Sequence, residues 1–166
     1  KLLVVGDMAV IPAPDFKQKQ IIMGHLVATA RAAGIAKPKV AIIAASEQML
    51  TSMPACMEAA MLAKMVDRGQ IKGCIADGPL ALDVAIDQES VEIKGLVSPV
   101  AGDADCLLFP NIESANVFYK ANSKLASNVK QAGMMVGAKV PCVLSSRADS
   151  IDTKLNSIAI AALSVK

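Results

Sequence analysis

Short aliphatic runs, each closed by polar or turn-forming residues, alternate with longer helix-like stretches along the chain. This alternation is typical of an α/β domain in which helices cover both faces of a parallel-rich sheet. The core must be aliphatic, because 54% of the 166 residues are hydrophobic but only 2% are aromatic. The length suits one domain and is enough to bury a substantial core.

Turn-forming residues and helix caps set the expected bounds of the elements. We expect strands at about 2–5, 38–44, 73–76, 107–109, 134–136 and 142–144, and helices at about 15–33, 54–69, 80–86, 89–94, 116–127 and 150–165. In the second of these helices Met57, Met61 and Met65 recur at a spacing of four. This stripe predicts core packing rather than a functional methionine surface.

The composition argues against several kinds of partner. The net charge is only +2, and the chain has neither a Lys/Arg run nor the aromatic residues of a nucleic-acid surface. The apolar run at 158–165 is far too short to span a bilayer, so no membrane partner is expected. The chain shows no targeting segment and begins without Met, which suggests that an upstream part has been removed or is not included.

Four dispersed cysteines predict buried free thiols rather than a metal site. Cys56, Cys74, Cys106 and Cys142 form no CxxC pair, and His25 is the single histidine of the chain. Zinc sites need clustered ligands, so a metal of that type is not expected. His25 lies mid-helix without a nearby base or ligand, which indicates a structural histidine. Unpaired thiols are typical of the reducing cytoplasm.

Polar residues follow several of the predicted strands. Ligands of open α/β sheets bind beyond the carboxyl ends of the strands. The segments expected there are 6–7, 45–47, 77–79, 110–111 and 145–147. The GxGxxG, P-loop, HExxH and GxSxG motifs do not occur, so the chemistries that they signal have no support here.

The densest polar cluster lies at 145–150. Asp149 or Ser150 can cap the last helix, and Asp152 suits its positive N-terminus. Capping does not require Arg147, whose planar fork before a helix N-terminus would suit an anion. The residues alone leave a plain cap and a phosphate site equally open.

Several strings in this sequence resemble the phosphate acetyl/butyryltransferase family. They run in the family's order over nearly the whole chain, and the fuller strings are similar to the butyryl branch. The strings are DRGQIKGC at 67–74, DGPLALD at 77–83, VAGDAD at 100–105, PNIE at 110–113, Asn116 with Tyr119 and Lys120, and SRADS at 146–150 followed by Thr153, Lys154 and NSIA at 156–159.

The resemblance implies an enzyme that converts acyl-CoA and phosphate to acyl phosphate and CoA, without a metal or bound cofactor. It also implies a two-domain fold like that of isocitrate and isopropylmalate dehydrogenases, with the site between the domains, and a cytoplasmic homodimer. Residues 1–140 would form the second domain. Residues 141–166 would form a strand and helix that return to the first domain, whose CoA contacts would be missing here.

The resemblance also implies roles for single residues. Ser146 would lie near the thioester sulfur and carbonyl, and Arg147 would hold phosphate. The further substrate contacts expected are Asp77, Gly78, Pro79, Asn116, Lys120, Asp149 and Thr153. Thr153 stands where the acetyl branch has an Asp proposed as base, which the butyryl branch replaces by Thr. Gly6, Gly24, His25 and Ala115 depart from the family's pattern.

Two other interpretations are weighed against a catalytic acyltransferase. A binding module for acyl-CoA or phosphate that has lost turnover is favoured slightly by Gly6, Gly24 and Ala115, whereas Ser146 and Arg147 favour the enzyme. A decarboxylating dehydrogenase of the same fold would need a carboxylate metal cluster and nicotinamide contacts, which we do not find in the sequence.

Overall fold

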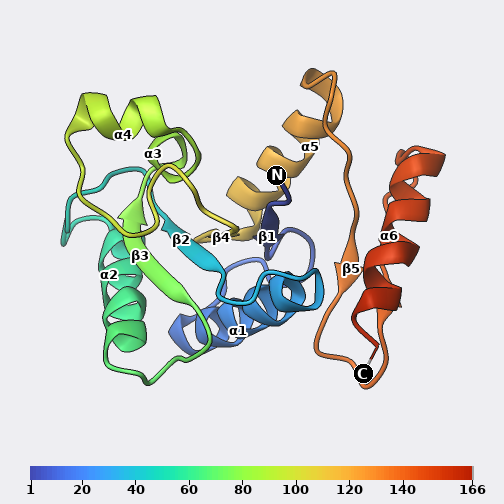
Figure 1. Cartoon of the computed structure of the whole chain (residues 1–166), viewed down its shortest axis with the longest axis horizontal. Coiled ribbons are helices and arrows are strands. Elements are labelled where there is room, and N and C mark those ends of the chain that lie inside the picture. Colours follow the sequence, from blue (N-terminus) through green and yellow to red (C-terminus); the bar gives the residue numbers. More distant parts are fainter. Residues whose placement is uncertain (166) are drawn as a thin grey trace.

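A four-stranded parallel sheet lies at the centre of the molecule (Figure 1). The computed structural model describes residues 1–165. The strands, in their spatial order, are β1 (Val4–Gly6), β4 (Cys106–Leu108), β2 (Lys39–Ile43) and β3 (Ile75–Leu80). β4 lies between β1 and β2 and pairs in parallel with both. β1, the first strand of the chain, therefore pairs with neither β2 nor β3.

Helices cover both faces of this sheet, as the sequence predicts (Figure 1). One face carries α1 (Phe16–Ala32) and α2 (Pro54–Asp67), and the other carries α3 (Leu82–Ile86), α4 (Gln88–Lys94) and α5 (Ile112–Leu125). The right-handed crossover rule explains which helices lie on which face. The chain moves in one direction across the sheet through α1 and α2 and returns in the other direction through α3 and α4, so the two pairs cover opposite faces. The expectation of an α/β fold with a parallel sheet is therefore confirmed.

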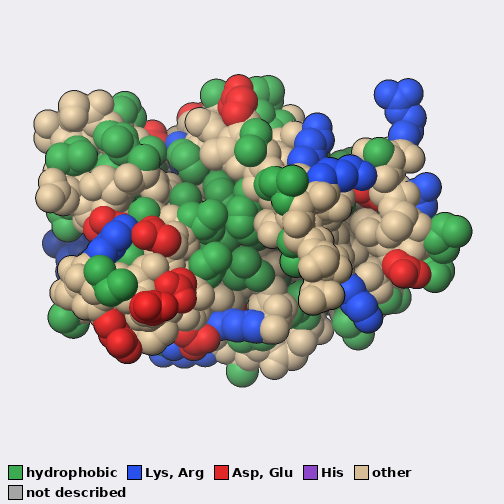
Figure 2. Space-filling view, turned by 90° about the horizontal axis from the view of Figure 1, so that it is seen from above, with side chains coloured by type: hydrophobic (Ala, Val, Ile, Leu, Met, Phe, Trp, Pro, Cys, Tyr) green, Lys and Arg blue, Asp and Glu red, His purple; other side chains and the backbone are tan. Residues whose placement is uncertain are grey.

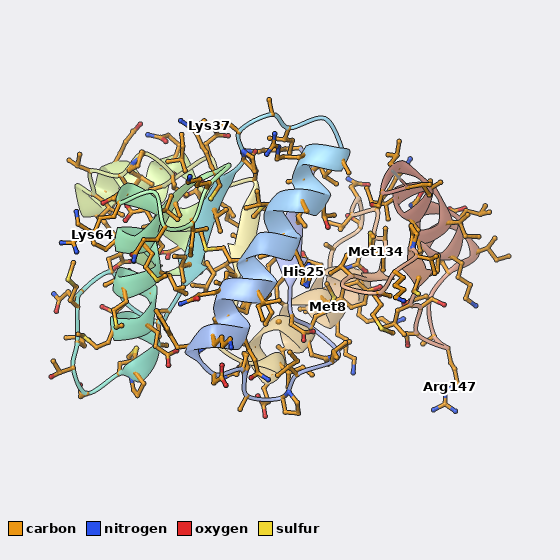
Figure 3. All side chains as sticks on the ribbon, turned by 90° about the horizontal axis from the view of Figure 1, so that it is seen from below. Met8, His25, Lys37, Lys64, Met134 and Arg147 are labelled. Atoms are coloured by element: carbon orange, nitrogen blue, oxygen red, sulfur yellow. The ribbon has the colours of Figure 1, made fainter. Side chains whose placement is uncertain are left out.

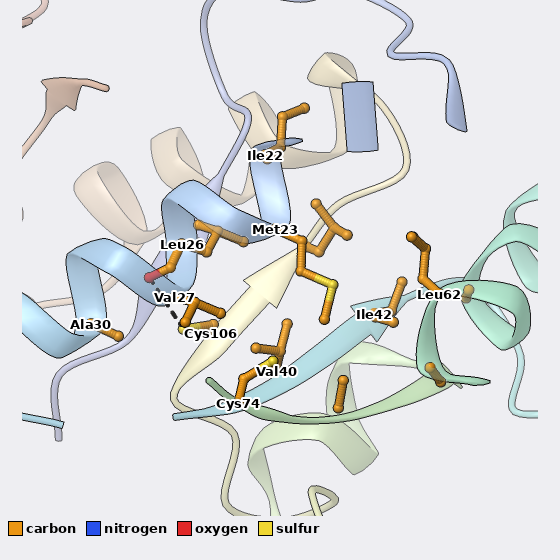
Figure 4. Close-up of a cluster of buried hydrophobic side chains, with 14 residues drawn as sticks. Ile22, Met23, Leu26, Val27, Ala30, Val40, Ile42, Leu62, Cys74 and Cys106 are labelled. Carbon is orange, nitrogen blue, oxygen red and sulfur yellow. Dashed lines mark hydrogen bonds between the residues drawn. The ribbon is translucent and has the colours of Figure 1, made fainter. Parts of the chain in front are cut away.

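Two aliphatic cores separate the helices from the sheet. The first lies under α1 and α2 and includes Met23, Leu26, Val40 and Leu62 (Figure 4). The second lies under the other helices, with Leu80, Val84, Leu107 and Ala115 among its buried members. Each large side chain contributes about 1.5–3 kcal/mol by burial. Figure 2 shows hydrophobic side chains gathered in a hollow between the α3–α4 side and α5.

Three of the four cysteines are buried free thiols, as expected. Burial, and next the charge of Asp105, raises the pKa of the Cys106 thiol to about 12, which keeps it protonated and unreactive. Burial also raises the pKa of Cys74. Cys142 is partly exposed, so the expectation of a buried thiol is wrong there.

The methionine stripe of α2 does not form its core face. Met61 is 53% exposed, and Met65 only packs against the edge of the first core. The buried residues of α2 are Cys56, Ala59, Leu62 and Ala63. These small side chains let the helix lie close to the sheet, and the methionines lie beside them rather than beneath the helix.

Side-chain caps explain where the helices begin. The Asp15 carboxylate accepts the N–H of Gln18, whose side chain accepts the N–H of Asp15, in a reciprocal capping box at α1. Asn111 accepts the N–H of Ser114 and caps α5, which therefore begins at Ile112 and not at 116 as expected. The start of this helix that the sequence predicts is therefore about one turn too late.

β3 is longer than the expected strand at 73–76, because it includes Asp77, Gly78 and Pro79. Asp77 pairs with Ala41 of β2 and Leu80 with Ile43, so Gly78 and Pro79 lie where the register between the two strands shifts. A Cβ on Gly78 would lie 2.8 Å from the Cβ and 2.9 Å from the carbonyl oxygen of Ile42. Only glycine permits this close approach of the two strands.

We expect Gly78→Ala to lower the free energy of unfolding by about 1–3 kcal/mol, because the added methyl group meets the backbone of Ile42. Urea unfolding followed by circular dichroism measures the change. Gly24→Ala is the matched control, since a Cβ there meets nothing within 4 Å. In the interior of α1 that control should stabilise by about 0.5–1 kcal/mol. Equal stability of Gly78→Ala and the unsubstituted chain would contradict the packing argument.

The C-terminal part stands beside the sheet and does not join it (Figure 1). β5 (Met134–Met135) pairs antiparallel with β6 (Cys142–Val143), and α6 (Ile151–Leu163) packs against this hairpin. The N–H of Gly133 donates to Oγ of the buried Ser157, at 2.9 Å. His25 of α1 is partly buried beside Gly137, where an added Cβ would lie 3.2 Å from its Nε2, which fits a structural role.

One apolar face of α6 is uncovered. Ile158 is 57% and Leu163 60% exposed, and Ile160 is partly buried. Ile151 and Leu155 extend the same exposed surface toward the start of the helix. Within residues 1–165, only Ser157 and Ala161 of this helix are buried.

Candidate active site

The loop after β1 is fixed by two polar side chains. The Asp7 carboxylate accepts the backbone N–H groups of Ala9, Val10 and Ile11 at 2.8–3.0 Å. From the other side, Nδ2 of Asn116 on α5 donates to the carbonyl oxygen of Met8 at 3.0 Å. The predicted contact residue Asn116 therefore lies against the carboxyl end of β1, and Figure 3 labels Met8 in the interior between α1 and the C-terminal part.

The segment Ser146–Arg147–Ala148–Asp149 is a closed turn. The Asp149 N–H donates to the carbonyl oxygen of Ser146 at 3.1 Å, and the Ser146 N–H donates to Oδ2 of Asp149 at 2.6 Å. The Ala148 N–H points to Oγ of Ser146 at 3.4 Å. The carboxylate of Asp149 thus closes the turn that carries both predicted catalytic residues.

Ser150 caps α6, which decides between the two cap residues that the sequence leaves open. Its Oγ accepts the N–H of Thr153 at 3.1 Å and lies 3.0 Å from the Thr153 hydroxyl. The predicted contact residue Thr153 is therefore hydrogen-bonded at the helix N-terminus, six residues after Arg147. Asp152 also lies in this first turn, where its negative charge complements the helix dipole.

Arg147 is exposed and extends away from the body of the molecule (Figure 3). It makes no salt bridge with another residue of the range 1–165. Its guanidinium fork is free for an anion that approaches the N-terminus of α6. Lys120 on α5 is also exposed.

The structure does not bring Asp77, Gly78 and Pro79 near the Ser146–Asp149 turn. They lie in β3, the edge strand farthest from α6 (Figure 1). Gly78 and Pro79 are buried, and Oδ1 of Asp77 accepts the N–H of Gly78 at 2.8 Å. The predicted residues therefore form two groups, one on α5 and the start of α6 and one on β3.

Two polar contacts near these groups were missed by the sequence analysis. The Tyr119 hydroxyl of α5 lies 3.4 and 3.5 Å from the two carboxylate oxygens of Asp149. Burial, followed by the nearby negative charge of Asp149, raises the pKa of Tyr119. The buried Lys19 forms an ion pair with Glu58 in a small hollow beside Phe109. The partners of both contacts lie far apart in the chain, so no local pattern signals them.

Other features of the described chain do not add to this site. A hollow of about 160 Å³ lies at the opposite, amino-terminal end of the strands, beside Leu3 and Asp103. No group of three or more His, Cys, Asp or Glu side chains within residues 1–165 is placed to bind a metal. In the same range, every helix is too short or too polar to cross a bilayer.

The family described as "Phosphate acetyl/butaryl transferase" matches residues 1–162. The phosphate butyryltransferase of Clostridium acetobutylicum is 50% identical over 98% of this chain and 54% of its own length. The phosphate acetyltransferase of Thermotoga maritima is 48% identical over 97% of this chain and 54% of its own length. The chain thus spans about half the length of these relatives.

A solved structure shares the arrangement of the elements. The branched-chain phosphotransacylase from Enterococcus faecalis V583 aligns with a TM-score of 0.88 at 33% identity. The match covers 98% of this chain and 59% of that one. It includes α6 and the β5–β6 hairpin as well as the sheet, since nearly the whole chain is aligned.

Proposed function

This chain belongs to the phosphate acetyl/butyryltransferase family, and on that premise we propose that the full-length protein transfers a short acyl group between CoA and inorganic phosphate. The observation that carries the proposal is the 50% identity with a phosphate butyryltransferase along nearly the whole chain. The identity with a phosphate acetyltransferase is almost as high, at 48%. Butyryl-CoA is the first substrate to test, since the fuller strings are similar to the butyryl branch.

The proposed reaction suits the residues around the Ser146 turn. A phosphate oxygen attacks the thioester carbonyl, the carbon–sulfur bond breaks, and CoA leaves as a thiolate that takes up a proton. Arg147 would hold the phosphate through its fork, and Ser146 would lie near the carbonyl oxygen or sulfur, where negative charge develops. Asn116 and Lys120 of α5, Asp149 of the turn itself and Thr153 of α6 stay proposed substrate contacts.

Asp77, Gly78 and Pro79 also stay proposed substrate contacts. They lie at the opposite edge of the sheet, so a substrate that touched both groups would have to extend across the molecule. CoA is long enough to reach from a reacting thioester to a remote binding surface. Binding energy from such a remote part of a substrate can position the reacting end.

The finer architecture is part of the proposal. Residues 1–140 would be the second domain of a two-domain enzyme related to isocitrate and isopropylmalate dehydrogenases, and 141–166 would pack on the first domain. The exposed apolar face of α6 supports this, because Ile151, Leu155 and Ile158 need a covering surface in a stable protein. The absence of a bound cofactor or metal, the homodimer and the cytoplasmic location stay predictions.

A binding module without turnover is less well supported than an enzyme. Two of the departures that favoured it are explained by packing. A Cβ on Gly6 would lie 3.1 Å from Leu26 of α1, and Ala115 is fully buried in the second core. Both residues are therefore set by contacts inside this domain, and neither signals a lost substrate contact.

The test uses the full-length gene product with butyryl-CoA. We expect release of free CoA thiol that depends on added phosphate and is accompanied by butyryl phosphate. Acetyl-CoA in a parallel assay measures the preference between the two branches. Binding of butyryl-CoA without phosphate-dependent thiol release would favour the binding module, and lack of both would reject the proposed function.

A further inference from the structure

We propose that Tyr119 is a positioning residue: its hydroxyl donates to Asp149 and thereby anchors the Ser146–Asp149 turn on α5. The inference rests on the proposed function, because the turn carries the predicted catalytic residues Ser146 and Arg147. It also changes the expected role of Asp149 from substrate contact to the link between this turn and α5.

The first step is the geometry of the turn. Asp149 is half-buried, whereas Ser146, Arg147 and Ala148 are exposed. Its carboxylate accepts the Ser146 N–H at 2.6 Å, and its own N–H returns to the Ser146 carbonyl oxygen at 3.1 Å. These two bonds fix the four-residue turn internally. They do not fix its position relative to the rest of the molecule.

The second step is the connection to α5. The Asp149 carboxylate that closes the turn also faces the Tyr119 hydroxyl, at 3.4 and 3.5 Å. A partly buried tyrosine hydroxyl needs a polar partner, and a carboxylate is a strong acceptor. Nε2 of Gln131 donates to the Tyr119 carbonyl oxygen at 2.9 Å, which holds the segment after α5 along the same side of the helix.

The third step is the position of Tyr119 on α5. One turn earlier, Asn116 donates to the carbonyl oxygen of Met8 after β1. A single helix thus contacts the loop after β1 through Asn116 and the Ser146–Asp149 turn through Tyr119. Along the chain, the turn is separated from α5 by residues 126–145, which include the β5–β6 hairpin. An error of about 1 Å in the position of a reacting group can cost about 100-fold in rate.

The first test removes the hydroxyl in the full-length enzyme. Tyr119→Phe should lower kcat for phosphate-dependent thiol release about 10-fold or more, with little change in the KM for butyryl-CoA and in Tm. Ser123→Ala, which removes an exposed hydroxyl from the same helix, is the control and should retain full activity. In an Asp149→Ala background, Tyr119→Phe should lower kcat by less than about 2-fold, because the link between Tyr119 and Asp149 is already broken.

Additive losses from Tyr119→Phe and Asp149→Ala would overturn the proposal, as would full activity of Tyr119→Phe. Either outcome leaves the proposed function unaffected, provided that the unsubstituted enzyme transfers the acyl group. If the unsubstituted enzyme shows no transfer at all, the proposed function fails, and the link is then decided by a measurement that does not require activity.

That second measurement is the ionisation of Tyr119 in the 166-residue chain. The chain contains one tyrosine and no tryptophan, so the ultraviolet absorbance of the phenolate reports on Tyr119 alone. Burial and next the Asp149 charge raise the pKa of Tyr119, so Asp149→Asn, which removes the charge, should move the phenolate transition to lower pH. Asp152→Asn is the control, since it removes a carboxylate from the same helix start without this contact. A transition unchanged in Asp149→Asn would show that the two side chains do not meet.

Discussion

The 166-residue chain alone should transfer butyryl groups at least about 100-fold more slowly than the full-length protein at equal concentration. Ser146 and Arg147 are exposed. The relatives that it matches are about twice as long. We therefore propose that the remaining half supplies the opposite wall of the site and covers α6.

Thiol release from butyryl-CoA in the presence of phosphate measures this difference. Addition of the separately produced preceding half should restore part of the activity if the two parts bind each other. The control is Leu155→Asp on the exposed face of α6, which should prevent that restoration without unfolding the sheet. Equal turnover by the short chain and the full-length protein would show that the site is complete within these residues.

Arg147→Lys in the full-length protein should lower kcat/KM for phosphate about 10- to 100-fold. Lysine keeps the positive charge but loses the fork that pairs with two phosphate oxygens at once. One hydrogen bond to a charged group contributes about 1.5–3 kcal/mol, which corresponds to this range of rates. Arg147→Ala, which removes the charge as well, should cost about 1,000-fold.

Both variants should fold normally, because Arg147 is exposed and makes no contact that the turn needs. Arg68→Lys is the matched control, since Arg68 is exposed at the end of α2. That control should leave the phosphate kinetics unchanged. If Arg147→Lys behaves in the same way as Arg68→Lys, the proposed anion role of Arg147 is wrong.

The sequence predicted the elements well where the signal was local. The strand at 38–44 and the helix opened by Asp15 have apolar runs, caps and glycines that act within a few residues. The sequence was misleading where tertiary pairing overrides composition. Asp77, Gly78 and Pro79 form turns in most contexts, but here they continue β3 because Gly78 permits close approach to β2.

The candidate site could be predicted only in part, for the same reason. The polar cluster at 145–150 is contiguous, so the turn and its cap were visible in the sequence. Tyr119 and Asp149 are 30 positions apart, and Lys19 and Glu58 are 39 apart, so neither contact leaves a periodic trace. The cap is Ser150, which accepts the N–H of Thr153, whereas the Asp149 carboxylate accepts the N–H of Ser146.

The position of β4 between β1 and β2 has a consequence for the order of folding. Val4 pairs with Cys106, about 100 residues later, and Val40 pairs with the same residue from the other side. During synthesis at roughly 5–20 residues per second, β1 therefore waits about 5–20 s, and β2 about 3–13 s, before the strand that joins them is made. Over this interval the edge of each strand that will face β4 is unpaired, and the sheet can close only when the nascent chain has passed Leu108.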